Sequence, residues 1–160
     1  MALELVSITL ADARRFIAEH HSHSAPPIGW RFGVGVIDAD RLVAVGVAGR
    51  PVARYLDSPD NIEITRVATD GTRMACSMVY AHLCAAARHL GYRTAYTYTL
   101  VSECATCPKA AGFTFDADSS DTRTWNRPRR PRLELDLFGN RPTPPVAKLR
   151  WARRLTRSPA

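Results

Sequence analysis

The sequence predicts an α/β (α+β) domain of mixed layout, and three observations support this. At 160 residues the chain is most simply one domain, long enough for a real core. Its apolar fraction of 46% is ordinary for a globular protein. Stretches that alternate apolar and polar residues are interspersed with stretches of helical spacing, in the predicted order β-α-β-β-β-α-β-α-β-β.

Local signals predict the elements of the N-terminal half. LELVSI, residues 3–8, is typical of a strand. Thr9 can cap a helix over residues 11–20, with Asp12 as its capping-box partner. Pro26 and Pro27 cannot continue that helix, so a loop follows it. Alternation then predicts strands over 30–38, 41–54 and 61–69, with DAD closing a hairpin between the first two.

The C-terminal half begins with a predicted helix over residues 74–90. Val79, Leu83, Ala86 and Leu90 recur at helical spacing, and Gly91 ends the helix. A short helix is expected around Pro108. Further strands are predicted over 93–100, 112–117 and 132–138.

The excess positive charge lies in the last quarter of the chain. Residues 1–120 carry 11 Lys and Arg against 12 Asp and Glu, whereas residues 121–160 carry 11 against 3. Trp125 and Trp151 lie among these arginines. Arginine forks suit phosphate oxygens and indoles stack on bases, so one interpretation is a DNA or RNA contact. The other is a solvated basic tail.

The composition also suggests a compartment. No apolar run approaches the length of a membrane span, and the N-terminus has no basic start followed by an apolar block. We therefore expect a cytoplasmic protein without a membrane partner. Its cysteines are then expected to be reduced thiols, including the single CxxC pair of Cys104 and Cys107, which we interpret as incidental.

Residues 69–77 carry the clearest functional signal. A strand passes into a helix here, and a helix start presents free N–H groups that favour an anion, above all phosphate. Most residues of the turn are small enough to let a ligand approach the backbone, and Arg73 adds a positive charge. The turn is therefore interpreted as a phosphate cradle. The alternative is an Asp-Gly turn present for conformational reasons alone.

With HLGYRTAYTYTL and KAAGFTF in the predicted positions, residues 30–113 resemble the GNAT superfamily of N-acyltransferases. The resemblance implies a mixed, mostly antiparallel central sheet flanked by helices. It also implies acetyl-CoA or another acyl-CoA as cofactor, with Met74 at the middle glycine of the family's pyrophosphate turn. The implied cofactor-binding residues are Val67, Ala68, Thr69, Gly71, Thr72, Arg73, Met74, Ala75, Cys76 and Ser77.

More narrowly, HHSHSAPPIG, TDGTRMACSMVY and AYTYTLVSE resemble a branch of GNAT-like proteins carried by phages and mobile elements. A looser resemblance links the chain to the phage Mom proteins, GNAT-like enzymes that modify adenine in DNA. Within this frame we expect a GNAT-like domain over residues 1–138 and a basic Arg/Pro-rich extension over residues 139–160.

Acyl transfer to an amine needs a base for the amine proton. Glu63 lies on the strand before the turn, where the family often places a base. Strand alternation predicts Glu63, Thr65 and Val67 on one face of that strand. The alternative for Glu63 is a solvated strand residue.

The reaction also needs an acid for the leaving thiolate. The family's usual tyrosine acid falls at Pro108, so the acid has to come from elsewhere. Tyr96 and Tyr98 share a face of the following strand, and Tyr98 is the preferred donor. Ser102 is a further candidate. The alternative for Tyr98 is a core aromatic.

Three histidines follow the first helix. His20, His21 and His23 could contribute to a transition-metal site, with His20 and His23 as the candidate ligands. His21 could instead face the substrate as a catalytic base. The alternative is a helix C-terminus, where imidazolium suits the dipole.

Together these features predict an acyl-CoA-dependent N-acyltransferase with an unidentified amine acceptor. A nucleic-acid base-modifying enzyme of Mom type is the first alternative. A GNAT-fold binding module without catalytic activity is the second.

Overall fold

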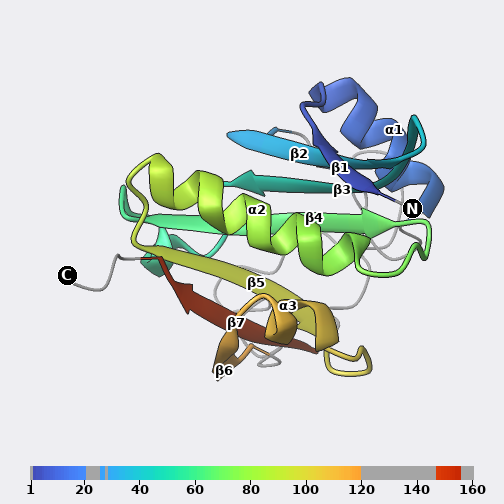
Figure 1. Ribbon diagram of the computed structural model, residues 1–160. Helices are drawn as coiled ribbons and strands as arrows, with labels where there is room; N and C mark the ends of the chain where they lie inside the picture. The colour runs from blue at the N-terminus through green and yellow to red at the C-terminus, as the bar shows by residue number, and fades with distance from the viewer. Residues whose placement is uncertain (1, 21–25, 28, 120–146, 156–160) are drawn as a thin grey trace, which may run out of the picture.

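The computed structural model describes residues 2–20, 26–27, 29–119 and 147–155, and these form one seven-stranded sheet with helices on both faces (Figure 1). The strand order is β1-β2-β3-β4-β5-β7-β6. The strands are β1 Leu3–Val6, β2 Phe32–Asp38, β3 Arg41–Gly49, β4 Asn61–Thr69, β5 Thr94–Leu100, β6 Thr114–Asp118 and β7 Lys148–Arg154. The helices are α1 Leu10–His20, α2 Ala75–His89 and α3 Thr106–Ala110, with a 3-10 turn, η1, over Arg54–Leu56.

Helix α1 forms where its capping residues predicted it. The Asp12 amide donates to Thr9 Oγ1 at 3.1 Å, and the Thr9 amide reaches Asp12 Oδ2 at 3.4 Å. This reciprocal pair is a capping box, which satisfies donors that a helix start otherwise leaves free. The β2–β3 hairpin also closes at Asp38–Arg41 as predicted, with Ala39 and Asp40 at positive φ.

Helices α1 and α2 cover opposite faces of the sheet. Val45 and Val47 of β3 pack with α1, whereas Ala44 and Ala48 pack with α2, as strand alternation requires. At Gly46 a Cβ would collide with Val79 and lie 2.7 Å from Leu83 Cδ1. Glycine there lets α2 lie close against the sheet. Of the predicted helical stripe, Val79 and Leu83 are buried, whereas Leu90 is 64% exposed.

The sheet is mostly antiparallel, which confirms the predicted fold class. Among the described strands, β4 and β5 form the one parallel pair, and helix α2 connects them. A parallel pair requires such a crossover because the chain has to return to the starting edge.

Strand β7 corrects the predicted domain boundary. Residues 148–154, which we expected in an extension outside the domain, pair antiparallel with β5 on one side and β6 on the other. Alternation explains the insertion, because Leu149 and Trp151 face the core beneath α2. The indole Nε1–H of Trp151 donates to Thr99 Oγ1 at 2.9 Å. The predicted strand over 132–138 lies outside the described residues.

None of the helices in the described part of the chain is long and apolar enough to cross a membrane.

Candidate active site

The parallel strands β4 and β5 form a fork. Their ladder covers only Asn61–Ile64 against Thr94–Thr97, and beyond it the strands diverge toward their C-terminal ends (Figure 1). A β-bulge accompanies the divergence: Val47 of β3 faces Arg66 and Ala48 faces Ile64, so Thr65 is the extra residue. A bulge bends its strand and increases the twist. The β5-facing edge of β4 beyond Ile64 is therefore not paired with β5.

The bulge also corrects a prediction about the faces of β4. Glu63, Thr65 and Val67 were expected on one face. Val67 instead packs against the α2-side cluster that holds Ile62 and Ile64. The extra residue at Thr65 shifts the alternation by one position, which moves every later side chain to the other face. Glu63 therefore lies on the opposite face from Val67.

Glu63 is the one buried carboxylate among the described residues, with 5% of its surface exposed. Its Oε2 accepts a hydrogen bond from the Val52 amide at 2.9 Å. Burial raises the pKa of Glu63, and the Val52 hydrogen bond, Arg66 and Lys148 partly offset this. A buried acid with a raised pKa suits a general base.

Tyr98 lies at the branch of the fork, one residue beyond the last paired position of β5. It is half-buried, on the same face of β5 as Tyr96, which is the ladder partner of Glu63. Burial raises the pKa of Tyr98, a hydrogen bond from Arg150 lowers it, and the Glu63 charge raises it again. Glu63 and Tyr98, predicted separately as base and acid, therefore lie on one face of neighbouring strands, where the Glu63 charge acts on the Tyr98 hydroxyl. Ser102 lies apart, in the exposed turn after β5.

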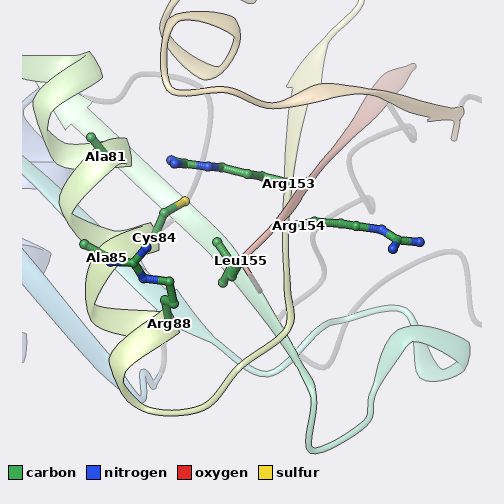
Figure 2. Close-up of a pocket in the computed structure, with 7 residues that line it drawn as sticks. All are labelled: Ala81, Cys84, Ala85, Arg88, Arg153, Arg154 and Leu155. Atoms are coloured by element: carbon green, nitrogen blue, oxygen red, sulfur yellow. The ribbon is translucent and has the colours of Figure 1, made fainter. Parts of the chain in front are cut away.

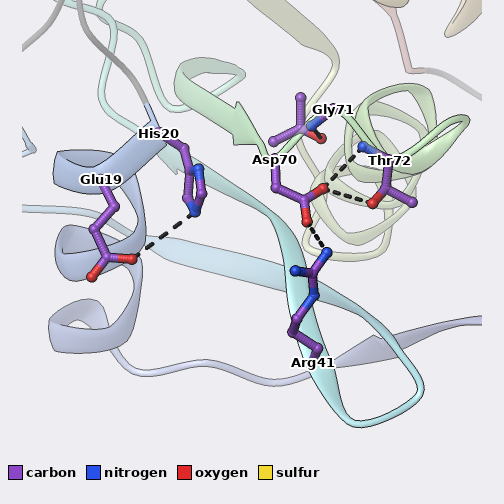
Figure 3. A network of polar contacts seen from close by, with 7 residues as sticks. Glu19, His20, Arg41, Asp70, Gly71 and Thr72 are labelled. Atoms are coloured by element: carbon purple, nitrogen blue, oxygen red, sulfur yellow. Dashed lines mark hydrogen bonds and ion pairs between the residues drawn. The ribbon is translucent and has the colours of Figure 1, made fainter.

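Asp70 organises the turn from β4 to α2 (Figure 3). Its Oδ1 accepts hydrogen bonds from the Thr72 amide at 2.9 Å and the Thr72 hydroxyl at 2.6 Å, and Oδ2 pairs with Arg41 at 2.5 Å. The Thr72 hydroxyl contributes most to holding the pKa of Asp70 below its ordinary value. Gly71 takes a φ of 98°, and a Cβ built there meets nothing within 4 Å. The Asp70 side chain thus fixes the conformation of the turn, while the space around Gly71 stays open to a ligand.

The start of α2 offers free donors beside this turn. The helix has no side-chain cap. Within the described residues, the amides of Arg73, Met74, Cys76 and Ser77 have no acceptor in the protein, whereas the Ala75 amide reaches Thr72 O at 3.3 Å. Burial, and then the neighbouring Cys107 thiol, raises the pKa of Cys76, so this side chain adds no negative charge. Free amides at a helix start fit a phosphate or diphosphate.

Met74 precedes α2 in the left-handed conformation, with a φ of 69°. The resemblance places a glycine at this position, and the backbone adopts the conformation that glycine favours. The Met74 side chain is 65% exposed and lies in solvent.

Met74→Gly is therefore expected to leave the free energy of unfolding unchanged or raise it by up to about 1 kcal/mol, because glycine relieves the left-handed strain. Met78→Gly is the matched control, since Met78 is an interior residue of α2 packed on the core. That control should lose about 1 kcal/mol from helix propensity alone. Urea unfolding measures both. A loss for Met74→Gly that approaches the loss for Met78→Gly would contradict the strain at Met74.

The histidine predictions divide between described and other residues. His20 ends α1 and packs its ring on Phe16, with ring centroids 4.2 Å apart. Its Nε2 lies 4.0 Å from Glu19 Oε2 (Figure 3). Its charge would also favour ionised Asp70. The predictions for His21 and His23 lie outside the described residues. In the described ranges, no group of three or more His, Cys, Asp or Glu side chains is arranged to hold a metal ion.

Sequence reasoning missed three residues of the face that holds Glu63 and Tyr98. Arg150 of β7 is the ladder partner of Tyr98, and it contacts Tyr55 of η1 and Asp116 of β6. Its side chain is only 12% exposed. The alternation of KLRWARR could have revealed a strand with Arg150 on the face opposite Trp151, but the basic composition favoured a tail.

A separate cavity of about 210 Å³ lies between α2 and the end of β7 (Figure 2). It is lined by Ala81, Cys84, Ala85, Arg88, Arg153, Arg154 and Leu155. The lining residues on α2 come from its later turns, whereas the free amides lie at its start. None of the predicted site residues lines this cavity.

No protein-family profile matches the chain, and no curated protein matches it. Solved structures do. The ribosomal-protein-S18-alanine N-acetyltransferase from Escherichia coli aligns with a TM-score of 0.63 at 13% identity, covering 99% of this chain and 97% of that one. A Bacillus subtilis acetyltransferase in complex with CoA aligns with a TM-score of 0.64 at 15% identity, covering 96% of this chain and 98% of that one. A Desulfovibrio desulfuricans protein assigned to the GNAT family of acetyltransferases aligns with a TM-score of 0.61 at 13% identity, covering 97% of this chain and 100% of that one. The chain therefore has the fold of the GNAT acetyltransferases.

Proposed function

We propose that this protein is an N-acyltransferase that moves an acyl group from acyl-CoA to an amine. The observation that carries the proposal is the fork itself. Its open edge lies between the free amides at the start of α2 and the face that holds Glu63 and Tyr98.

The residues present fit acyl-CoA. The amides of Cys76 and Ser77 and the exposed Arg73 would hold the pyrophosphate. The unpaired edge of β4 over residues 67–69 would offer main-chain groups to the pantetheine arm. When bound, acyl-CoA supplies an acyl group activated as a thioester.

In this proposal Glu63 accepts the proton of the acceptor amine, directly or through one water. A main-chain N–H at the open edge of β4 would stabilise the oxyanion. Tyr98 donates its hydroxyl proton to the leaving thiolate. The amine acceptor itself stays unassigned.

The two alternatives are weaker. The nucleic-acid interpretation depends largely on residues 121–146 and 156–160, which lie outside the described residues. The binding-module interpretation depends on Met74 and Pro108, but Met74 lies in solvent and Tyr98 offers a hydroxyl in place of the family's tyrosine.

Titration with acetyl-CoA tests the proposal. At about 100 times its Kd, acetyl-CoA is expected to raise the free energy of unfolding by about 2.7 kcal/mol. Acetylpantetheine, which lacks the pyrophosphate, should bind far more weakly. Release of free CoA thiol in the presence of a panel of polyamines and peptides then tests transfer. No stabilisation at millimolar acetyl-CoA would overturn the proposal, and binding without thiol release would favour the binding module.

A further inference from the structure

Arg150 connects four segments that are distant in the sequence. Its Nε donates to Asp116 Oδ2 of β6 at 2.5 Å, and its Nη1 donates to the Tyr55 hydroxyl of η1. In the antiparallel ladder Arg150 lies directly opposite Tyr98 of β5, so the two side chains share one face of the sheet. Because its donors are directed to Asp116 and Tyr55, the guanidinium has a defined orientation on the face that it shares with Tyr98.

Two tyrosine rings reinforce this orientation. The Arg150 guanidinium carbon lies 5.4 Å from the Tyr55 ring centroid and 5.9 Å from that of Tyr96. At these distances a cation is attracted to the face of an aromatic ring. The β6 bulge between Phe115 and Ala117 contains Asp116, whose carboxylate reaches the same guanidinium. Among the described residues, Asp116 is the one ion-pair partner of Arg150.

We propose that Arg150 is a positioning residue that holds the Tyr98 hydroxyl for proton donation to the leaving thiolate, with Asp116 and Tyr55 fixing its own orientation. This inference rests on the acyl transfer proposed above. It assigns to β7 a role in the site, although the composition of this segment indicated a tail.

The charges around Tyr98 explain why an arginine suits this position. Burial disfavours the tyrosinate form of Tyr98 most, and Glu63 of β4 and Tyr55 of η1 add to this, whereas Arg150 of β7 favours tyrosinate. A general acid is most effective when its pKa lies near the working pH. Without Arg150, the remaining neighbours would push the pKa of Tyr98 higher and make it a weaker acid.

The proposed step balances in atoms and charge. The amine nitrogen forms its bond to the acyl carbon, and Glu63 takes up one amine proton. The carbon–sulfur bond breaks, and the sulfur receives the proton of the Tyr98 hydroxyl. The resulting tyrosinate lies beside the Arg150 guanidinium, which stabilises its charge until a proton from solvent restores the hydroxyl. Glu63 releases its proton to solvent, which restores the base.

Kinetics of Arg150→Gln, Arg150→Lys, Tyr98→Phe and the double variant Arg150→Gln/Tyr98→Phe test this role. Misplacing a reacting group by about 1 Å can cost about 100-fold in rate, and we expect a kcat loss of that order for Arg150→Gln with little change in the KM for acyl-CoA. The kcat of Arg150→Lys should lie between those of the wild type and Arg150→Gln, because lysine keeps the positive charge but lacks the planar guanidinium. Arg154→Gln is the matched control, an exposed arginine of the same strand, and should keep wild-type kcat.

Two readouts separate positioning from a merely structural role. In the Tyr98→Phe background, Arg150→Gln should lower kcat little further, because Arg150 acts through Tyr98. The basic limb of the kcat–pH profile, where Tyr98 loses its proton, should move to higher pH in Arg150→Gln. An equal loss in both backgrounds, or an unmoved basic limb, would overturn the inference.

NMR titration of the tyrosines, without acyl-CoA, gives a readout that does not need turnover. The Tyr98 resonance, assigned by its loss in Tyr98→Phe, should titrate at higher pH in Arg150→Gln than in the wild type or Arg154→Gln. An unchanged titration would contradict the inference. If the wild type neither binds acetyl-CoA nor releases thiol, the proposed function fails; if it is active and Arg150→Gln matches Arg154→Gln, only the role of Arg150 fails.

Discussion

Glu63→Gln is expected to lower kcat by about 100-fold or more, because a glutamine cannot accept the amine proton and general bases contribute about that much. Binding of acetyl-CoA should be unchanged, since the proposed cradle lies at the start of α2. Thiol-release kinetics and calorimetric titration measure the two effects. Glu103→Gln, which alters an exposed carboxylate in the turn after β5, is the control and should retain full activity.

The pH dependence of Glu63→Gln provides a second check. Burial raises the folded-state pKa of Glu63 above its ordinary value of 4.5. The folded state therefore holds this proton over a pH range where the unfolded state has lost it, and stability falls as pH rises through the folded pKa. Glu63 can act as a base only above its folded-state pKa. The acidic limb of the wild-type kcat–pH profile should therefore lie at a higher pH than it would for a glutamate of ordinary pKa.

Glutamine removes the buried charge but can still accept the Val52 hydrogen bond. The thermal stability of Glu63→Gln at neutral pH should therefore not fall below that of the wild type, which separates lost chemistry from misfolding. Wild-type kcat in Glu63→Gln at neutral pH would exclude Glu63 as the base.

Ser77→Asp is expected to weaken acetyl-CoA binding by about tenfold or more, equivalent to about 1.4 kcal/mol. Ser77 lies in the first turn of α2, where a carboxylate would repel the pyrophosphate. The same carboxylate complements the helix dipole and should stabilise the fold by about 0.3–1 kcal/mol. Binding and stability should thus change in opposite directions, as measured by calorimetric titration and thermal unfolding.

Ser77→Asn is the matched control for this prediction, since it has nearly the same shape without the charge. It should bind acetyl-CoA close to the wild-type affinity. Equal affinities for Ser77→Asp and Ser77→Asn would show that no anion binds at the start of α2.

Several features of the fold were predictable from the sequence because their causes are local. The Thr9–Asp12 capping box, the β2–β3 hairpin and strand β4 over Asn61–Thr69 all formed where expected. Each depends on neighbours within a few residues, through a side-chain cap, a tight turn or strand alternation. The turn before α2 likewise depends on residues close together in the sequence.

The bulge at Thr65 was not predictable from alternation. It depends on how β4 meets β3, and one extra residue reversed the faces of the later side chains. The approach of Glu63 to Tyr98 was anticipated only as two candidates on neighbouring strands. Their common face follows from the parallel register of Glu63 with Tyr96.

The sequence by itself determined the order of elements from β1 to β6, the turn before α2 and the two candidate acid–base residues, because each follows from short-range patterns. Only the tertiary structure decided that β7 lies between β5 and β6, which brings Arg150 to Tyr98. Pairing between strands about 50 residues apart depends on which sheet edge remains open after the rest has folded, and no local pattern encodes that choice.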